Sequence, residues 1–196
     1  MRILLSADLH GDFSKLARLA EKVDLCICCG DVIDYHQLPT EDFSFPRPFY
    51  CVKGNKEIWG GESLQQALTK CPNFFWLNDH LDKLERRTGL RFYGIDFLHE
   101  PPMLPASVDF LISHQPAFGL ADQCSDPFHA KSVEHCGSKA IRQLVDQHRP
   151  RFIVAGHVHT YQKQQLRETL GITLPSALNP PVVMIINQEI CCFNGF

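Results

Sequence analysis

A repeated pattern constrains this chain more than any other feature: five short apolar runs each stop at polar residues that can bind a metal ion. In chain order, the runs end at Asp8 and His10, at Asp31, at Asn55, at His114, and at His157 and His159. Uninterrupted apolar runs, such as residues 25–29, are typical of strands buried on both faces of a parallel sheet. Functional sites in α/β sheets gather beyond the carboxyl ends of the strands. We therefore expect five separate segments to deliver these side chains to one edge.

Two of the five segments carry a pair of such residues two positions apart, Asp8 with His10 and His157 with His159. In extended backbone, residues at this spacing point to the same side, so each pair is expected to act as a pincer. Glycines at three of the run ends predict sharp exits from the strands, where the backbone approaches a ligand closely. They are Gly30, Gly54 and Gly156.

The residue types indicate the kind of metal. Four imidazoles, two carboxylates and one amide oxygen form a mixed nitrogen and oxygen set, which suits Mn, Fe, Zn, Ni or Co better than Ca or a thiolate-bound metal. Seven ligands exceed the need of one ion but suffice for two if one carboxylate bridges them. Two ions about 3.5–4 Å apart form the clamp used in phosphoryl hydrolysis. The predicted cofactors are two divalent transition metal ions: Mn, Fe, Zn or Ni.

The rest of the chain predicts one α/β domain over residues 1–196. Helices are expected at 13–23, 62–69 and 138–147, where apolar residues recur at helical spacing. Strands are expected at 2–7, 25–29, 49–52, 74–77, 81–85, 90–94, 109–113, 152–156 and 182–186, with a hairpin turn joining 81–85 to 90–94. Loops at 35–48, 95–107 and 115–136 are expected to decide the substrate. Trp59 and Trp76 are interpreted as packing residues, although Trp59 is close enough to Asn55 to line a substrate pocket.

The composition limits the kinds of molecule that the chain is expected to bind. The chain has 22 acidic and 19 basic residues, a net charge of −3, and so lacks the basic field typical of proteins that bind long nucleic acids. No apolar segment approaches the roughly 20 residues of a membrane-spanning helix, and no secretory signal is visible. We expect a cytoplasmic protein that acts on a small phosphoester, without a membrane partner. The oligomeric state stays open.

The nine cysteines favour a reducing compartment. Their number is odd, and several lie inside apolar runs, as expected of cysteine used as a small apolar residue. Free buried thiols are therefore predicted. Cys26 and Cys29 form a C-x-x-C, but residues three apart on a strand point to opposite faces, which argues against redox or zinc chemistry there.

The five segments read Asp8-Leu9-His10, Gly30-Asp31-Val32-Ile33-Asp34, Gly54-Asn55-Lys56-Glu57, Ser113-His114-Gln115-Pro116 and Gly156-His157-Val158-His159. In this order they resemble the motifs of the calcineurin-like metallophosphoesterases: D-x-H, G-D-x-x-D, G-N-H-[DE], [GS]-H-x-P and G-H-x-H. The resemblance runs from residue 6 to about residue 160, and the stretch from Leu111 to His159 looks most like the small single-domain phosphodiesterases.

This resemblance implies a four-layer α/β/β/α sandwich, with two mixed sheets between helices, and it implies roles. Asp8, His10 and His159 would hold one metal, Asn55, His114 and His157 the other, and Asp31 would bridge both. Catalytic roles fall to Asp31, Asn55, Lys56 and His114, of which Asn55, Lys56 and His114 would also bind substrate. Asp34 would orient neighbouring ligands.

One position departs from the family pattern: the histidine of G-N-H is Lys56 here. Lysine can contact phosphate as a point charge but is a poorer proton donor at neutral pH, since its ordinary pKa is about 10.4. An ion pair between Lys56 and Glu57 or another acid is the alternative interpretation. The general acid is thereby in question, and four histidines in predicted loops are candidates to replace it: His36, His99, His129 and His135.

The predicted function is hydrolysis of phosphodiesters by a hydroxide that bridges the two metals. Two alternatives stay open: a phosphomonoesterase, including a protein phosphatase, and a non-catalytic metal-binding scaffold on the same fold. A nuclease acting on long duplexes is disfavoured because the chain has neither a basic field nor an added domain to grip DNA.

Overall fold

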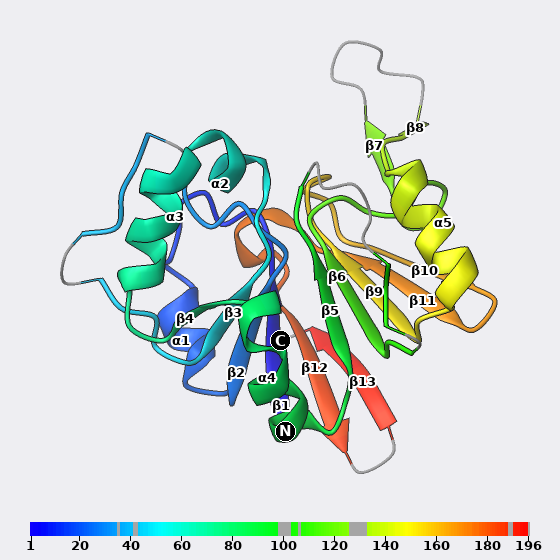
Figure 1. The fold of residues 1–196 in the computed structure, drawn as a ribbon, viewed down its shortest axis with the longest axis horizontal. Coiled ribbons are helices and arrows are strands. Elements are labelled where there is room, and N and C mark those ends of the chain that lie inside the picture. The colour runs from blue at the N-terminus through cyan, green and yellow to red at the C-terminus, as the bar shows by residue number, and fades with distance from the viewer. Residues whose placement is uncertain are drawn as a thin grey trace.

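The protein folds into two mixed β-sheets that lie face to face, with helices on both outer faces (Figure 1). The computed structural model describes residues 1–34, 36–40, 43–97, 103–105, 107–125, 133–187 and 190–195. The first sheet has the spatial order β13 (Ile190–Gly195), β12 (Val182–Asn187), β1 (Arg2–Ser6), β2 (Leu25–Cys28), β3 (Phe49–Cys51), β4 (Phe74–Trp76). The second has the order β10 (Gln162–Leu166), β11 (Thr169–Thr173), β9 (Phe152–Ala155), β6 (Phe110–Ser113), β5 (Phe92–Ile95).

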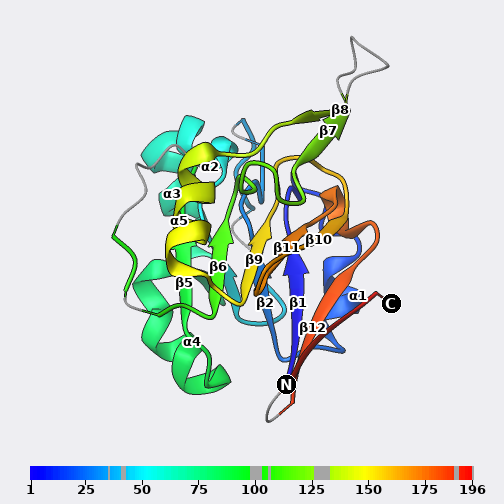
Figure 2. The ribbon, with the colours of Figure 1, turned by 90° about the vertical axis from the view of Figure 1, so that its right-hand side faces the viewer.

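Both sheets are parallel at their centres and antiparallel at one margin. Strands β1 to β4 run parallel, whereas β12 is antiparallel to β1 and β13 is antiparallel to β12. In the second sheet β5, β6, β9 and β11 run parallel, and β10 is antiparallel to β11. Figure 2 shows β1, β6 and β9 pointing the same way, so the loops that follow them gather at one end of the molecule. The predicted four-layer sandwich of two mixed sheets is confirmed.

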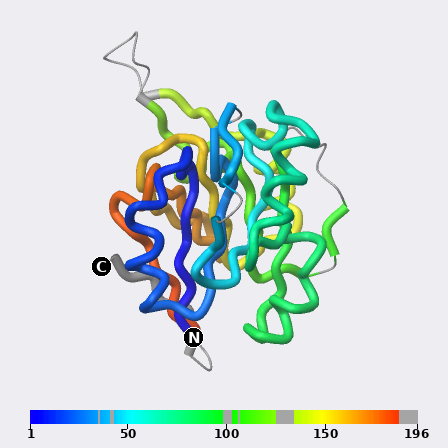
Figure 3. The backbone as a smooth tube through the Cα atoms, turned by 90° about the vertical axis from the view of Figure 1, so that its left-hand side faces the viewer, coloured from blue at the N-terminus to red at the C-terminus, as the bar shows by residue number. Residues whose placement is uncertain are grey.

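Three clusters of apolar side chains fill the spaces between the four layers. Ile3 and Leu5 of β1 pack into the core between the sheets, whereas Leu4 faces the opposite side, as the alternation of strand side chains requires. That opposite side is covered by α1 (Leu16–Ala20) and α3 (Gly61–Lys70), the blue-to-cyan segments of Figure 3. The outer face of the second sheet is covered by α5 (Lys139–His148). Cys26 and Cys29 fall in different clusters, which confirms that they point to opposite faces.

The segment predicted as a strand at 81–85 is instead the helix α4 (Leu81–Thr88). Leu81 and Leu84 are three positions apart, the spacing of one helical face, and both pack on the core between the sheets. The expected hairpin turn is the end of this helix, where Gly89 has a φ of 71° that glycine adopts without strain. The strand predicted at 90–94 is β5. The remaining short helices are α2 (Asn55–Trp59), η1 (Asn78–His80) and η2 (Ser176–Leu178).

The predicted loop at 115–136 contains a small antiparallel pair, β7 (Gln123–Ser125) and β8 (Val133–His135). A disulfide joins Cys124 to Cys136 beside this pair, so the expectation of free thiols is wrong for these two cysteines. It is confirmed for five others, which are buried and unpaired: Cys26, Cys28, Cys29, Cys51 and Cys71. Among the described residues, no helix has the length and apolar character needed to cross a membrane.

Candidate metal centre

Every predicted metal ligand follows a strand, and the two sheets share the ligands between them. From the first sheet come Asp8 and His10 after β1, Asp31 after β2, and Asn55, which follows β3 and begins α2. From the second sheet come His114 after β6, and His157 and His159 after β9. The candidate site therefore lies across the seam where the two sheets meet, and neither sheet alone carries the full set.

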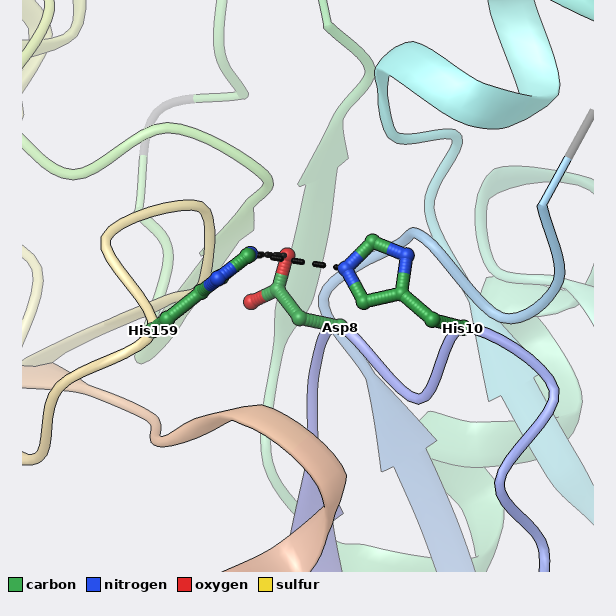
Figure 4. Close-up of side chains that lie close together, drawn as sticks. All are labelled: Asp8, His10 and His159. Atoms are coloured by element: carbon green, nitrogen blue, oxygen red, sulfur yellow. Dashed lines mark hydrogen bonds and ion pairs between the residues drawn. The ribbon is translucent and has the colours of Figure 1, made fainter.

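One group of ligand atoms consists of Asp8, His10 and His159, whose potential ligand atoms all lie within 4.8 Å of one another. Figure 4 shows the two imidazoles on either side of the Asp8 carboxylate. The Nε2 atoms of His10 and His159 are 3.4 Å apart, and His159 Nε2 is 3.4 Å from Asp8 Oδ1. These side chains come from opposite sheets and converge on one point.

The second group centres on His114, whose side chain is fully buried. Its Nε2 atom lies 2.9 Å from Asn55 Oδ1, 3.2 Å from His157 Nδ1 and 3.7 Å from Asp31 Oδ1. Ligand atoms of Asp8, Asp31 and His114 also lie within 4.8 Å of one another. Asp8 and Asp31 thus connect the two groups, and all seven predicted ligands belong to one cluster.

Hydrogen-bond partners leave unprotonated nitrogens pointing into this cluster. His114 Nδ1 is 2.7 Å from the Cys29 carbonyl oxygen; because a carbonyl only accepts, Nδ1 carries the proton and Nε2 is left as a lone pair. His10 Nδ1 is 3.1 Å from Asp34 Oδ1, which likewise leaves its Nε2 free of a proton. In the neutral rings these two nitrogens face other predicted ligands, since His114 Nε2 is 2.9 Å from Asn55 Oδ1 and His10 Nε2 is 3.4 Å from His159 Nε2.

The carboxylate of Asp8 also indicates a cation site. Its side chain is fully buried, and Oδ1 has no hydrogen-bond partner, the one such buried side-chain atom among the described residues. An unsatisfied buried oxygen costs about 1–3 kcal/mol or more. Together with the inward lone pairs, this orphaned carboxylate oxygen fits a site built for cations.

The pKa shifts of three predicted ligands agree with this interpretation. Burial, with His114 close by, lowers the pKa of His157 to about 4, so His157 is neutral at pH 7 and able to ligate. Burial raises the pKa of Asp31 despite the nearby His114. The nearby Asp8 carboxylate raises the pKa of His159. A buried carboxylate and a neutral imidazole in one cluster are chemically prepared for a divalent ion.

Five of the seven predicted ligands have left-handed backbone conformations, which corrects the reasoning behind the two pincers. The φ angles are 51° at Asp8, 48° at His10, 55° at Asp31, 70° at His157 and 60° at His159. The pairs converge because the backbone turns sharply, not because it is extended. Each such residue costs on the order of 1 kcal/mol relative to ordinary backbone, and such strain clusters at functional sites.

The three glycines have the close contacts that the sequence predicted. A Cβ atom on Gly30, whose φ is 95°, would lie 2.5 Å from the backbone nitrogen of Gly54 and 2.8 Å from His114 Nδ1. A Cβ on Gly156 would lie 2.7 Å from Asp8 Oδ2. Larger residues at these positions would displace the predicted ligands themselves.

Glu57 is a structural element of the site that the sequence analysis did not assign. It is fully buried and accepts hydrogen bonds from the backbone N–H groups of Asp31, Val32 and Gly54 at 2.8–2.9 Å. The carboxylate thereby fixes the loop after β2 against the start of α2. Burial, together with the Asp31 charge, raises the pKa of Glu57. In the sequence, this role could have been inferred from the acidic residue that ends the G-N-H-[DE] motif, a position that Glu57 occupies.

Replacing Glu57 by alanine is expected to lower the free energy of unfolding by about 2–4 kcal/mol, because three buried N–H groups lose their acceptor. Urea unfolding followed by circular dichroism measures this. Glu62→Ala, at an exposed position of α3, is the matched control and should change stability by less than about 0.5 kcal/mol. Equal effects of the two substitutions would show that Glu57 does not hold the loop.

The sequence matches the profile of one protein family, described as calcineurin-like phosphoesterase, over residues 1–161. The chain belongs to the calcineurin-like phosphoesterase family. It is a metal-binding hydrolase that acts on phosphoester bonds. A search of curated proteins finds no match.

Solved structures with the same fold include a dimetal phosphatase from Danio rerio, with 13% identity, a TM-score of 0.64, and coverage of 100% of this chain and 95% of that chain. A novel archaeal phosphodiesterase has 12% identity, a TM-score of 0.50, and coverage of 100% and 99%. The anchor in the inner membrane complex of Plasmodium has 11% identity, a TM-score of 0.63, and coverage of 100% and 84%. At such low identities these similarities show the shared fold alone.

Lys56, where this phosphoesterase departs from the family motif, pairs with Asp34 and not with Glu57. Its Nζ lies 3.3 Å from Asp34 Oδ1, and the same oxygen holds His10 Nδ1. Partial burial opposes ionisation of Asp34, but hydrogen bonds from Lys56 and His10 keep its pKa below the ordinary value. Asp34 thus links the predicted ligand His10 to Lys56.

Four histidines were candidates to replace the G-N-H histidine of the family, and the structure places them in different parts of the chain. His135 Nδ1 is 2.6 Å from Oδ1 of the buried Asp122, and its ring contacts Phe118. Asp122 also accepts the backbone N–H groups of Gly119 and Gly137, so this pair closes the loop around β7 and β8. His99 and His129 lie outside the described residues, and His36 lies in the predicted loop at 35–48.

Proposed function

We propose that this phosphoesterase hydrolyses phosphodiesters at a site that holds two divalent transition metal ions. In this proposal Asp8, His10 and His159 hold one ion, Asn55, His114 and His157 hold the other, and Asp31 is shared. The observation that carries the proposal is the convergence of imidazole, carboxylate and amide groups at the seam between the sheets, where the buried Asp8 Oδ1 has no hydrogen-bond partner. The dimetal phosphatase with the same fold supports the number of ions.

When bound, such a pair of ions polarises the phosphate and supplies a hydroxide nucleophile at neutral pH. The chain's own residues set the geometry. Asp34 holds the His10 ring through Nδ1 so that Nε2 points inward, and the Cys29 carbonyl does the same for His114. Rigid orientation of this kind preserves ligand geometry during the reaction.

Lys56 is proposed to neutralise charge on the phosphate, not to donate a proton to the leaving group. Its Nζ atom is 3.3 Å from Asp34 Oδ1, with 24% of the side chain exposed, so Lys56 lies at the edge of the cluster, where it can contact a phosphate as a point charge. Substrates with good leaving groups therefore suit this site best.

The preference for diesters over monoesters is a proposal supported by likeness in size and fold to the archaeal phosphodiesterase, of which the alignment covers 99%. The test is to compare kcat/KM for bis-p-nitrophenyl phosphate and p-nitrophenyl phosphate after loading with Mn²⁺. We expect the diester to be preferred and both activities to vanish on chelation. Preference for the monoester would replace this proposal with a phosphatase. Bound metal without turnover of either ester would indicate the scaffold alternative.

A further inference from the structure

Two aromatic rings meet at a right angle beside the candidate metal centre and form what we call the Trp59–Phe97 corner. The rings of Trp59 and Phe97 are 6.3 Å apart with an interplanar angle of 87°. Phe97 also lies 5.7 Å from the rings of both His114 and His157. The corner is therefore continuous with the second group of predicted ligands.

The helix α2 explains the position of Trp59. Asn55 begins this helix and Trp59 ends it, and residues four apart lie on the same helical face. The chain thus carries the indole one turn beyond a predicted metal ligand. Trp59 is 60% exposed, so the residue is accessible from solvent.

Phe97 is held in place by the segment that leads into α2. Its backbone N–H donates to the Lys53 carbonyl oxygen at 2.8 Å, and the Lys53 N–H donates to Asp96 Oδ1 at 2.8 Å. These two bonds join the loop after β5 to the end of β3. The chain itself thus positions Phe97, which limits the conformational entropy that this residue would lose on binding.

We propose that the Trp59–Phe97 corner binds a planar aromatic group of the substrate, of the nucleobase class, while the phosphate occupies the metal centre. This inference rests on the proposed phosphodiesterase function and adds a substrate class to it. A flat ring that stacks on one wall presents its edge to the other, the arrangement that aromatic groups prefer.

The test compares two diesters with the same leaving group: the p-nitrophenyl ester of thymidine monophosphate and methyl p-nitrophenyl phosphate. Trp59→Ala should lower kcat/KM for the nucleoside ester about ten-fold, the change that about 1.4 kcal/mol of stacking represents, mainly through KM. The methyl ester should change less than about two-fold. Trp59→Phe, which keeps a ring, should retain most of the preference.

Two further variants serve as controls for the comparison of the two esters. Asp82→Asn, at an exposed position of α4, should leave both esters unaffected, and Lys56→Ala should lower kcat/KM for both alike. If the wild type hydrolyses both esters and Trp59→Ala affects them equally or not at all, the aromatic subsite is refuted while the phosphodiesterase function stands.

A binding measurement separates the inference from turnover. Adenosine monophosphate added to the metal-loaded protein should quench tryptophan fluorescence saturably, and the Trp59→Phe variant should lose this quenching although Trp76 is still present. Inorganic phosphate alone should not quench. Equal quenching in the wild type and in Trp59→Phe would overturn the proposal, whether or not either ester is hydrolysed.

Discussion

Replacing Asp31 by asparagine is expected to reduce metal content from two ions toward one or none and to lower kcat/KM for a phosphodiester by on the order of 10³-fold. The reason is positional. Asp31 Oδ1 lies 3.7 Å from His114 Nε2, and the carboxylate also belongs to the cluster with Asp8. Asparagine keeps the shape but removes the charge that two cations would share.

The Asp31→Asn protein should still fold, which makes its loss of function interpretable. The Asp31 Oδ1 atom accepts the backbone N–H of Lys56 at 2.9 Å, and an amide oxygen can accept the same bond. Elemental analysis, circular dichroism and turnover of bis-p-nitrophenyl phosphate are the measurements. Asp82→Asn, at an exposed position of α4, is the control and should be neutral. Two retained ions and undiminished turnover would contradict the shared role of Asp31.

Removing metal is expected to lower the melting temperature by roughly 5–10 °C. A ligand present at 100 times its Kd stabilises the folded state by about 2.7 kcal/mol, and for a chain of this length 1 kcal/mol corresponds to about 2–4 °C. Two buried carboxylates, Asp8 and Asp31, lie in one cluster, and a third, Glu57, accepts the backbone N–H of Asp31. Bound cations would relieve this repulsion and join the two sheets across their seam.

The measurement is thermal unfolding of the same preparation before and after chelation, and again after Mn²⁺ is restored. The wild type should lose and regain stability, whereas Asp31→Asn should respond weakly to either treatment. Asp82→Asn should respond as the wild type does. A melting temperature that is identical with and without metal in the wild type would show that the cluster does not hold ions in the folded state.

Most of the layout was predictable from the sequence because it follows from long-range regularities. Apolar runs that end in Asp8, Asp31 or His114 predicted parallel strands with ligands at one edge, and the structure has both. Parallel strands align their carboxyl ends, so the approximate meeting point followed even though the backbone angles did not. The left-handed conformations at Asp8 and His10 depend on loop closure between strands, which spacing alone does not encode.

What could not be predicted depends on contacts between distant segments. The sequence from Leu81 to Thr88 has only two leucines to define its period, and packing against the core selects the helix. For Lys56 the sequence left two interpretations open, a contact with the phosphate or an ion pair with Glu57 or another acid. The structure pairs Lys56 with Asp34, whereas Glu57 faces the backbone of the neighbouring loop. Cys124 and Cys136 are brought together by the pairing of β7 with β8, a local fold inside what the composition presents as a loop.

The left-handed backbone conformation at five predicted ligands affects how amino-acid differences at these positions should be interpreted. Asp and His tolerate such backbone angles better than branched or bulky residues do, so at His10 or His159 a substitution is rejected for its shape as well as for its chemistry. Asn55 and His114 have ordinary φ angles. Saturation mutagenesis at these two positions would therefore report on coordination chemistry with less interference from backbone geometry.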